Sequence, residues 1–254
     1  MMDVSEQEYV VIELYISFAD RLRRAFKRMV GVFFNPFSTF DSIAEDPDLL
    51  GPGLLLLAYL LLVIASLWLY NSRIVVNYIN ETSGVTLKEF LAVELIRDPK
   101  ILAISSVMTL LRLIGGWLLG LATLWLMNSL LKGVATGKSL LSASGYLIAL
   151  VIADSLAHTA LFLIAASTPI VVKVTMLSNP LRMLSIIRAR VIEYLLANQS
   201  SLMVFDKFLW ILFRAWILGS LVALSNSVMR ISIPRALVAG IASFVAFLLG
   251  GWIG

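Results

Sequence analysis

An apolar segment from Gly51 to Leu69, which contains no charged side chain, is the feature that most limits what this chain can fold into. A helix needs about 20 mostly apolar residues to cross a bilayer, and this segment meets that requirement. Four further segments repeat the pattern: 101–131, 140–166, 208–229 and 236–253. Hydrophobic residues make up 60% of the sequence and charged residues 14%, against about 45–50% and about 25% in soluble domains. The sequence therefore predicts an integral membrane protein and argues against a soluble globular enzyme.

The apolar runs are continuous rather than alternating, which argues against a β-barrel. We predict an all-α fold, a polytopic membrane protein with a five-helix transmembrane bundle and interfacial amphipathic helices. Residues 1–50 would form an N-terminal amphipathic helix and the segment leading into the first span, and residues 51–254 the transmembrane domain. The second span, 101–131, is long for a single crossing. We expect it to be tilted, kinked near Gly115-Gly116 or partly interfacial.

Two segments outside these spans combine apolar and basic side chains at helical spacing. From Val10 to Val32, apolar residues recur every three or four positions, and another face holds a basic cluster: Arg21, Arg24, Lys27 and Arg28. Such a helix suits a membrane surface with anionic headgroups. The alternative is a helix that packs on the protein's own bundle, and the two are compatible. Segment 170–196 is a second candidate, in which Asn179-Pro180 marks a helix start.

The distribution of basic residues favours a cytoplasmic N-terminus. With that orientation, the short inner loops 132–139 and 230–235 carry two basic residues each, and short loops weigh most in orientation. The sequons at Asn80 and Asn198 then fall in the outer loops and are possible glycosylation sites. Five spans would place the C-terminus outside.

Four ionisable residues fall within the predicted spans: Arg112, Asp154, His158 and Arg214. Charged groups in the membrane are costly unless they are paired, which makes them candidate functional residues. Asp154 and His158 share a helix face because they are four positions apart. A structural pair between Asp154 and Arg112 or Arg214 is the favoured interpretation. The alternative is a proton or ion path in a small transporter or channel subunit.

Small residues recur within the predicted spans, among them Gly115, Gly116, Gly120 and Gly240. Small side chains let helices approach closely in a bilayer. Folding of the bundle is the favoured use of these positions. Contact with a second copy or with another membrane protein is the alternative, and the lipid bilayer itself is the remaining expected partner.

The sequence offers little for catalysis. It has no cysteine and one histidine, and it lacks phosphate-binding, dinucleotide-binding, zinc-protease and serine-hydrolase motifs. We therefore predict no catalytic residues, no metal site, no cofactor and no nucleic-acid partner. An acidic group before the first span is the least favoured candidate for catalysis: Asp41, Glu45, Asp46 and Asp48.

Three stretches resemble the Yip family, the Ypt/Rab-interacting membrane proteins, in its broad prokaryotic form. In residues 33–47 an Asn-Pro is followed by an aromatic residue, an Ile-Ala and an acidic residue before proline. Residues 133–145 resemble the family's glycine-rich turn into the third span, with Gly145-Tyr146 within it. Residues 210–237 resemble its closing hairpin.

The resemblance implies a five-helix domain with a cytoplasmic N-terminus. We favour a non-enzymatic scaffold or membrane-organising role of the Yip type, because segment 10–32 is amphipathic and catalytic motifs are missing. For eukaryotic members the resemblance implies vesicle traffic, small-GTPase binding and membrane shaping. Within the first stretch we expect Pro36 to end the amphipathic helix, because the residue before proline avoids the α region. We expect Ser38 or Thr39 to cap a short helix that follows.

Overall fold

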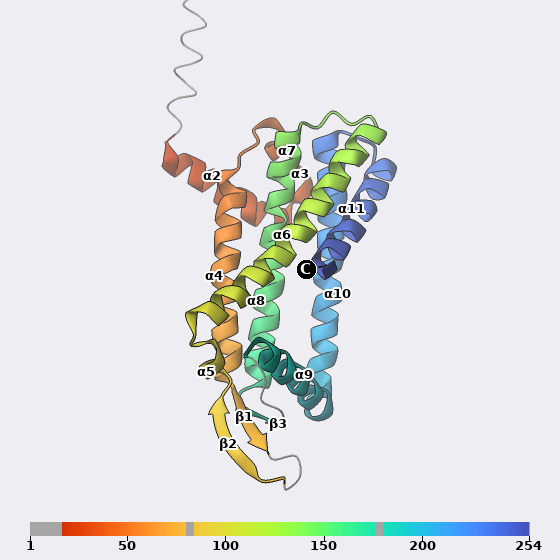
Figure 1. The fold of residues 1–254 in the computed structure, drawn as a ribbon. Coiled ribbons are helices and arrows are strands. Elements are labelled where there is room, and N and C mark those ends of the chain that lie inside the picture. The colour runs from red at the N-terminus through yellow and green to blue at the C-terminus, as the bar shows by residue number, and fades with distance from the viewer. Residues whose placement is uncertain (1–16, 80–83, 176–179, 254) are drawn as a thin grey trace, which may run out of the picture.

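A computed structural model describes residues 17–79, 84–175 and 180–253, and Figure 1 shows its helical bundle. Within these residues five helical segments are long and apolar enough to cross a membrane, as predicted. They are α4 (Leu50–Ser72), α6 (Pro99–Leu130), α7 (Gly137–Tyr146) continued by α8 (Ile148–Ala165), α10 (Ser200–Met229) and α11 (Ile233–Ile253). The all-α polytopic fold is thereby confirmed.

In the described residues before the first span lie two helices, α2 (Phe18–Phe34) and α3 (Pro36–Glu45). Asn35 separates them, so the expected helix end before Pro36 is confirmed. The expected cap was wrong, because Asn35 and not Ser38 or Thr39 caps α3. Its side-chain oxygen accepts a hydrogen bond from the Ser38 amide at 3.4 Å. The part of predicted segment 10–32 before residue 17 lies outside the described residues.

A three-stranded sheet lies at the opposite end of the bundle from α2 and was not predicted (Figure 1). Its strands are β1 (Ile74–Ile79), β2 (Thr86–Leu91) and β3 (Ile170–Val174), in the order β2-β1-β3. Strand β1 is antiparallel to β2 and parallel to β3. A short helix, α5 (Val93–Ile96), leads from β2 towards α6. Both β1 and β3 are short β-branched runs beside a span, and such runs cannot be told from helix by periodicity alone.

Helix α9 (Pro180–Asn198) covers this sheet. The predicted helix start at Asn179-Pro180 is confirmed at Pro180. One face of α9 is buried with the sheet, through Met183, Ile187, Val191 and Leu195. These side chains recur every four residues, as one face of a helix requires. The sheet and α9 form a hydrophobic core of their own, separate from the core of the bundle.

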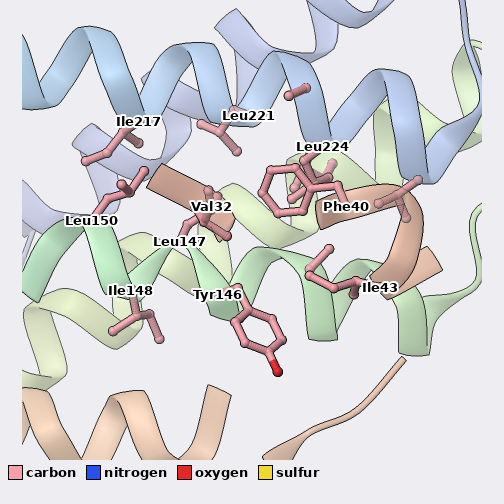
Figure 2. Packing of buried hydrophobic residues seen from close by; sticks show 14 of the residues in the cluster. Val32, Phe40, Ile43, Tyr146, Leu147, Ile148, Leu150, Ile217, Leu221 and Leu224 are labelled. Atoms are coloured by element: carbon pink, nitrogen blue, oxygen red, sulfur yellow. The ribbon is translucent and has the colours of Figure 1, made fainter. Parts of the chain in front are cut away.

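The core of the bundle includes the two N-terminal helices. Val32, Phe40 and Ile43 are fully buried against residues of α7, α8 and α10 (Figure 2). Burying a large apolar side chain contributes about 1.5–3 kcal/mol. Helices α2 and α3 are therefore integral parts of the fold rather than a loose arm.

Glycines bring α6 and α11 into backbone contact. A Cβ added at Gly116 would lie 2.7 Å from the Phe247 carbonyl oxygen, and one at Gly250 would lie 2.7 Å from the Gly115 carbonyl oxygen. The small residues at these positions thus pack the bundle, the use favoured from the sequence. Helix α6 is continuous over 32 residues, so the chain stays helical through Gly115-Gly116. It runs obliquely across the bundle (Figure 1).

Candidate functional site

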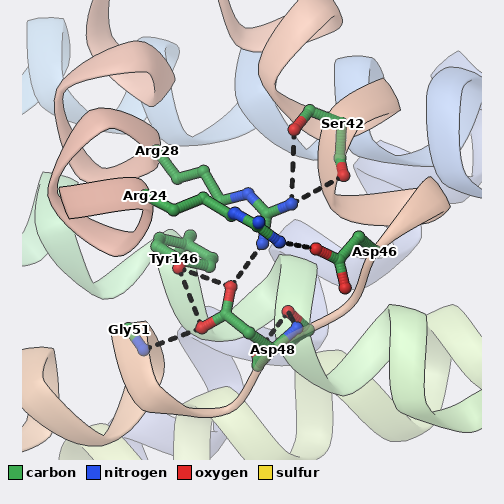
Figure 3. Close-up of polar contacts among 8 residues, drawn as sticks. Arg24, Arg28, Ser42, Asp46, Asp48, Gly51 and Tyr146 are labelled. Carbon is green, nitrogen blue, oxygen red and sulfur yellow. Dashed lines mark hydrogen bonds and ion pairs between the residues drawn. The ribbon is translucent and has the colours of Figure 1, made fainter. Parts of the chain in front are cut away.

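A network centred on Arg28 and Asp48 joins α2 to the start of the first span (Figure 3). The Arg28 guanidinium forms an ion pair with Asp48 and donates to the Ser42 carbonyl oxygen at 2.8 Å. Tyr146 on α7 donates its hydroxyl to Asp48 at 2.8 Å, and the Gly51 amide donates to the same carboxylate at 2.9 Å. We call these residues the Arg28–Asp48 network. It joins α2, α3, the first turn of α4 and α7.

Close backbone approach makes this network possible. The Ser142 hydroxyl donates to the Asp48 carbonyl oxygen and accepts from the Asp48 amide, which fixes the chain against α7. A side chain at Gly51 would overlap Tyr146, and a Cβ at Gly145 would lie 2.6 Å from Pro52 Cβ. Gly51-Pro52 and Gly145-Tyr146 therefore interlock, with a glycine facing the larger residue of the other pair. The stretch 133–145, which carries part of the family resemblance, thus contacts the residues that directly follow the stretch 33–47.

One residue of the predicted basic cluster is buried inside the protein, and the other three lie at its surface. Arg28 is only 4% exposed and is paired with Asp48. Arg24 forms an ion pair with Asp46 at the surface, where both side chains are largely exposed. Arg21 and Lys27 are exposed. The sequence did not reveal that two of the four basic residues have carboxylate partners in the segment leading into α4.

One exposed face of α2 is apolar. Its side chains repeat every four residues and are 41–84% exposed: Phe18, Leu22, Phe26, Val30 and Phe34. The face towards the bundle is formed by Ala25, Arg28 and Val32, which are buried. A third face carries exposed polar residues, including Asp20, Arg23 and Lys27. Helix α2 therefore packs on its own bundle and presents a continuous apolar face outward.

A second set of charged side chains lies between α8 and α10. Asp154 Oδ2 lies 3.0 Å from Arg214 Nη1, and Asp154 Oδ1 lies 3.0 Å from His158 Nε2. The other ring nitrogen of His158, Nδ1, lies 2.7 Å from Asp206 Oδ1. We call these four residues the α8–α10 cluster. Three of the four intramembrane charges predicted from the sequence thus meet.

The α8–α10 cluster runs from the rim of the bundle towards its interior. Asp206, in the second turn of α10, has a 39% exposed side chain, whereas Asp154 is only 8% exposed. A histidine protonated on both nitrogens carries a positive charge, and here that charge would lie between the two carboxylates. In that form the positive charges of His158 and Arg214 balance the negative charges of Asp154 and Asp206. The guanidinium of Arg214 also lies 5.3 Å from the centre of the Trp210 ring, a cation–π arrangement.

Arg112 does not join this cluster. Its side chain is exposed on α6, and it makes no ion pair or hydrogen bond through its side chain to any described residue. Asp206 was missed because the fourth span was predicted to begin at Phe208, whereas α10 begins at Ser200. The eight-residue spacing of Asp206 and Arg214 places both on one helix face, and that signal could have linked them.

The acidic residues before the first span do not gather into a metal site. Asp46 and Asp48 face Arg24 and Arg28, and Asp41 and Glu45 are exposed. In the described part of the chain, no group of three or more potential ligand residues could hold a metal ion. Of the two possible glycosylation sites, Asn80 lies outside the described residues. Asn198 ends α9, and its amide donates to the Tyr194 carbonyl oxygen at 2.8 Å.

The five apolar helices and the N-terminal helices packed on them define a polytopic α-helical membrane protein. Comparison with protein families matches the Yip1 domain over residues 30–254. The chain therefore belongs to the Yip1 domain family. Comparisons with curated proteins and with solved structures give no match.

Proposed function

We propose that this Yip-family protein is a non-enzymatic membrane-organising scaffold that acts on the bilayer through α2. The observation that carries the proposal is the exposed apolar face of a helix whose opposite face is fixed to the bundle. That face comprises Phe18, Leu22, Phe26, Val30 and Phe34, and Arg28 is buried on the opposite side. An amphipathic helix of this kind inserts its apolar face about 5–10 Å into the headgroup and acyl boundary.

The fixed position of α2 supports this action. Figure 1 shows α2 near the first turn of α4, which is the beginning of the first span. The Arg28–Asp48 network and the buried Val32 fix it to the spans. A helix that is anchored in this way displaces lipid in one leaflet only. Such one-sided insertion favours curvature of that leaflet.

Charge supports the same placement. Arg21 and Lys27 remain exposed on α2, where they can meet anionic headgroups. Each basic residue near an anionic surface is worth about 1 kcal/mol. The proposed orientation therefore places α2 on the cytoplasmic side and the sheet with α9 on the other side. The C-terminus and the two sequons then lie outside.

The α8–α10 cluster supports the structural interpretation better than the transport alternative. Asp154 is almost fully buried and paired with both Arg214 and His158. A paired, buried carboxylate fixes which helices touch. An ion path would need groups that are open to exchange with water on both sides of the membrane.

Because the chain has no cysteine, single cysteines can report the depth of α2 directly. We expect a nitroxide at Phe26→Cys to be accessible to oxygen in the acyl region. The same label at Lys27→Cys should be accessible to a water-soluble nickel reagent. Equal aqueous accessibility at both positions would overturn the proposal.

A second experiment tests the effect on the bilayer. Phe18→Ser combined with Phe26→Ser should reduce the vesicle tubulation produced by the purified protein. The matched control, Asp20→Ser with Arg23→Ser, changes the polar face without changing net charge and should retain tubulation. Tubulation that survives in the first variant, or that is absent in the unmodified protein, would refute a membrane-shaping role.

A further inference from the structure

Arg112 lies near the middle of an apolar helix and has no ion-pair partner among the described residues. It is the fourteenth residue of the 32-residue α6, and between Lys100 and Lys132 it is the sole charged residue. Its side chain is exposed on the outside of the bundle. No described residue forms an ion pair with it.

Lipid alone is a poor environment for this group. A charged side chain at the centre of a span costs at least about 2.5–3.5 kcal/mol, and such residues normally face a partner or a water-filled cavity. Helical side chains lean towards the N-terminus, which here is the sheet side. Arg112 is twelve positions from Lys100, about 18 Å along the helix axis, and the residues between them are uncharged. The guanidinium therefore starts well inside the hydrocarbon region.

The face around Arg112 is suited to another helix. Met108 and Leu111 are exposed beside it, and Leu119 continues the same face. The small residue Ala122 is also exposed on α6, whereas Gly115 packs against Gly250 of α11. A small side chain on an exposed helix face permits a close approach of another helix in a bilayer. The apolar side chains would provide buried contact area between the two helices, and the Arg112 guanidinium would select which helix binds.

We infer that this face of α6 docks a transmembrane helix of a different protein, one that carries a carboxylate within its membrane-embedded part. A bidentate pair with a carboxylate would satisfy the Arg112 guanidinium in the bilayer. This inference goes beyond the proposed action of α2, because it concerns the lipid-facing side of the bundle.

A second copy of the chain fits this face less well. A two-fold contact centred on Arg112 would place two guanidinium groups together. Within the five described spans the only carboxylates are Asp154 and Asp206, and both are already paired. A second copy therefore offers no free carboxylate at this depth. The partner helix must therefore carry its own carboxylate.

The test uses synthetic transmembrane helices of leucine and alanine with one central glutamate or glutamine. The full-length protein is reconstituted in vesicles, and its association with each labelled helix is measured by energy transfer. We expect the glutamate helix to bind about tenfold more tightly than the glutamine helix. Arg112→Gln should abolish that difference, and Arg112→Glu should transfer the preference to a helix with a central lysine.

Three outcomes would overturn the inference. Equal binding of the two helices would show that Arg112 does not select a carboxylate. Energy transfer between labelled copies that depends on Arg112 would assign the face to self-association. Equal binding with contact between Arg112 and lipid phosphorus in NMR spectra would show that the residue reaches the headgroups instead. The depth of a label at Phe26→Cys should be unchanged in Arg112→Gln, which separates this test from that of the proposed function.

Discussion

Arg28 and Asp48 form an ion pair across 20 residues of sequence, and the arginine side chain is only 4% exposed. The pair holds the N-terminal helix α2 to the point where the chain enters the first span. The position of α2 relative to the spans is thus set by charge as well as by apolar packing.

Asp48→Asn should destabilise the protein strongly. It leaves the buried Arg28 guanidinium without its counter-charge, and removing one partner of a buried pair costs about 3–5 kcal/mol. The free energy of unfolding in mixed micelles measures the loss. Asp46→Asn is the matched control, because the exposed pair with Arg24 is worth less than about 1 kcal/mol. Similar losses in the two variants would contradict the assigned role of Asp48.

Tyr146→Phe should weaken the same network by a smaller amount. The change removes the hydroxyl that donates to Asp48 at 2.8 Å and keeps the buried ring. Hydrogen bonds to charged groups contribute about 1.5–3 kcal/mol. The same unfolding measurement applies. In an Asp48→Asn background the hydroxyl should contribute less, and fully additive losses would show that the two groups act independently.

Gly145→Ala should disrupt the contact between α7 and the start of α4. Its new methyl group would lie 2.6 Å from Pro52, and overpacking of this kind costs about 1–3 kcal/mol. Gly219→Ala on α10 is the control, because no atom lies within 4 Å of a Cβ there. Alanine favours helix by up to about 1 kcal/mol over glycine, so the control should be neutral or more stable. Thermal unfolding in detergent distinguishes the two.

Asp154→Asn should loosen the contact between α8 and α10 without changing ion flux. The variant leaves Arg214, whose side chain is 22% exposed, without its carboxylate partner. We expect a loss of about 3–5 kcal/mol, against less than about 1 kcal/mol for Asp206→Asn at the exposed rim. Flux into proteoliposomes should stay at background in both. Flux in the unmodified protein that Asp154→Asn abolishes, with folding intact, would favour the transport alternative.

The spans could be predicted from the sequence because the bilayer imposes a length and an apolar composition on each of them. The pairing of Asp154 with Arg214 was among the predicted alternatives, since their depths could be estimated from span ends. The partner of Arg28 was not predictable in this way. Asp48 lies in an irregular turn, where no periodicity reports which side chain faces inward. The surroundings of Arg112 could not be predicted either. The depth of a residue along a span does not say whether its helix face points into the bundle or away from it.

Cross-linking should establish the parallel register of β1 and β3, which the sequence did not indicate. Val75 is the register partner of Val171. Cysteines at these two positions should form a disulfide readily under mild oxidation. A pair at Val75 and Lys173, displaced by two residues, should react far more slowly. Equal reaction of the two pairs would contradict the parallel pairing.

The parallel pairing of β1 with β3 also sets the order in which the parts of the sheet can form during synthesis. Strand β1 follows the first span, whereas β3 follows the third, so α6, α7 and α8 must be made before the two strands can meet. Until then, β1 and β2 can form only a two-stranded hairpin, in which the edge of β1 that later pairs with β3 is open. The sheet can therefore be completed only after the first three spans have been made and inserted into the membrane. Nascent chains stalled before β3 should leave this edge open to chaperones, and chains stalled after α9 should close it.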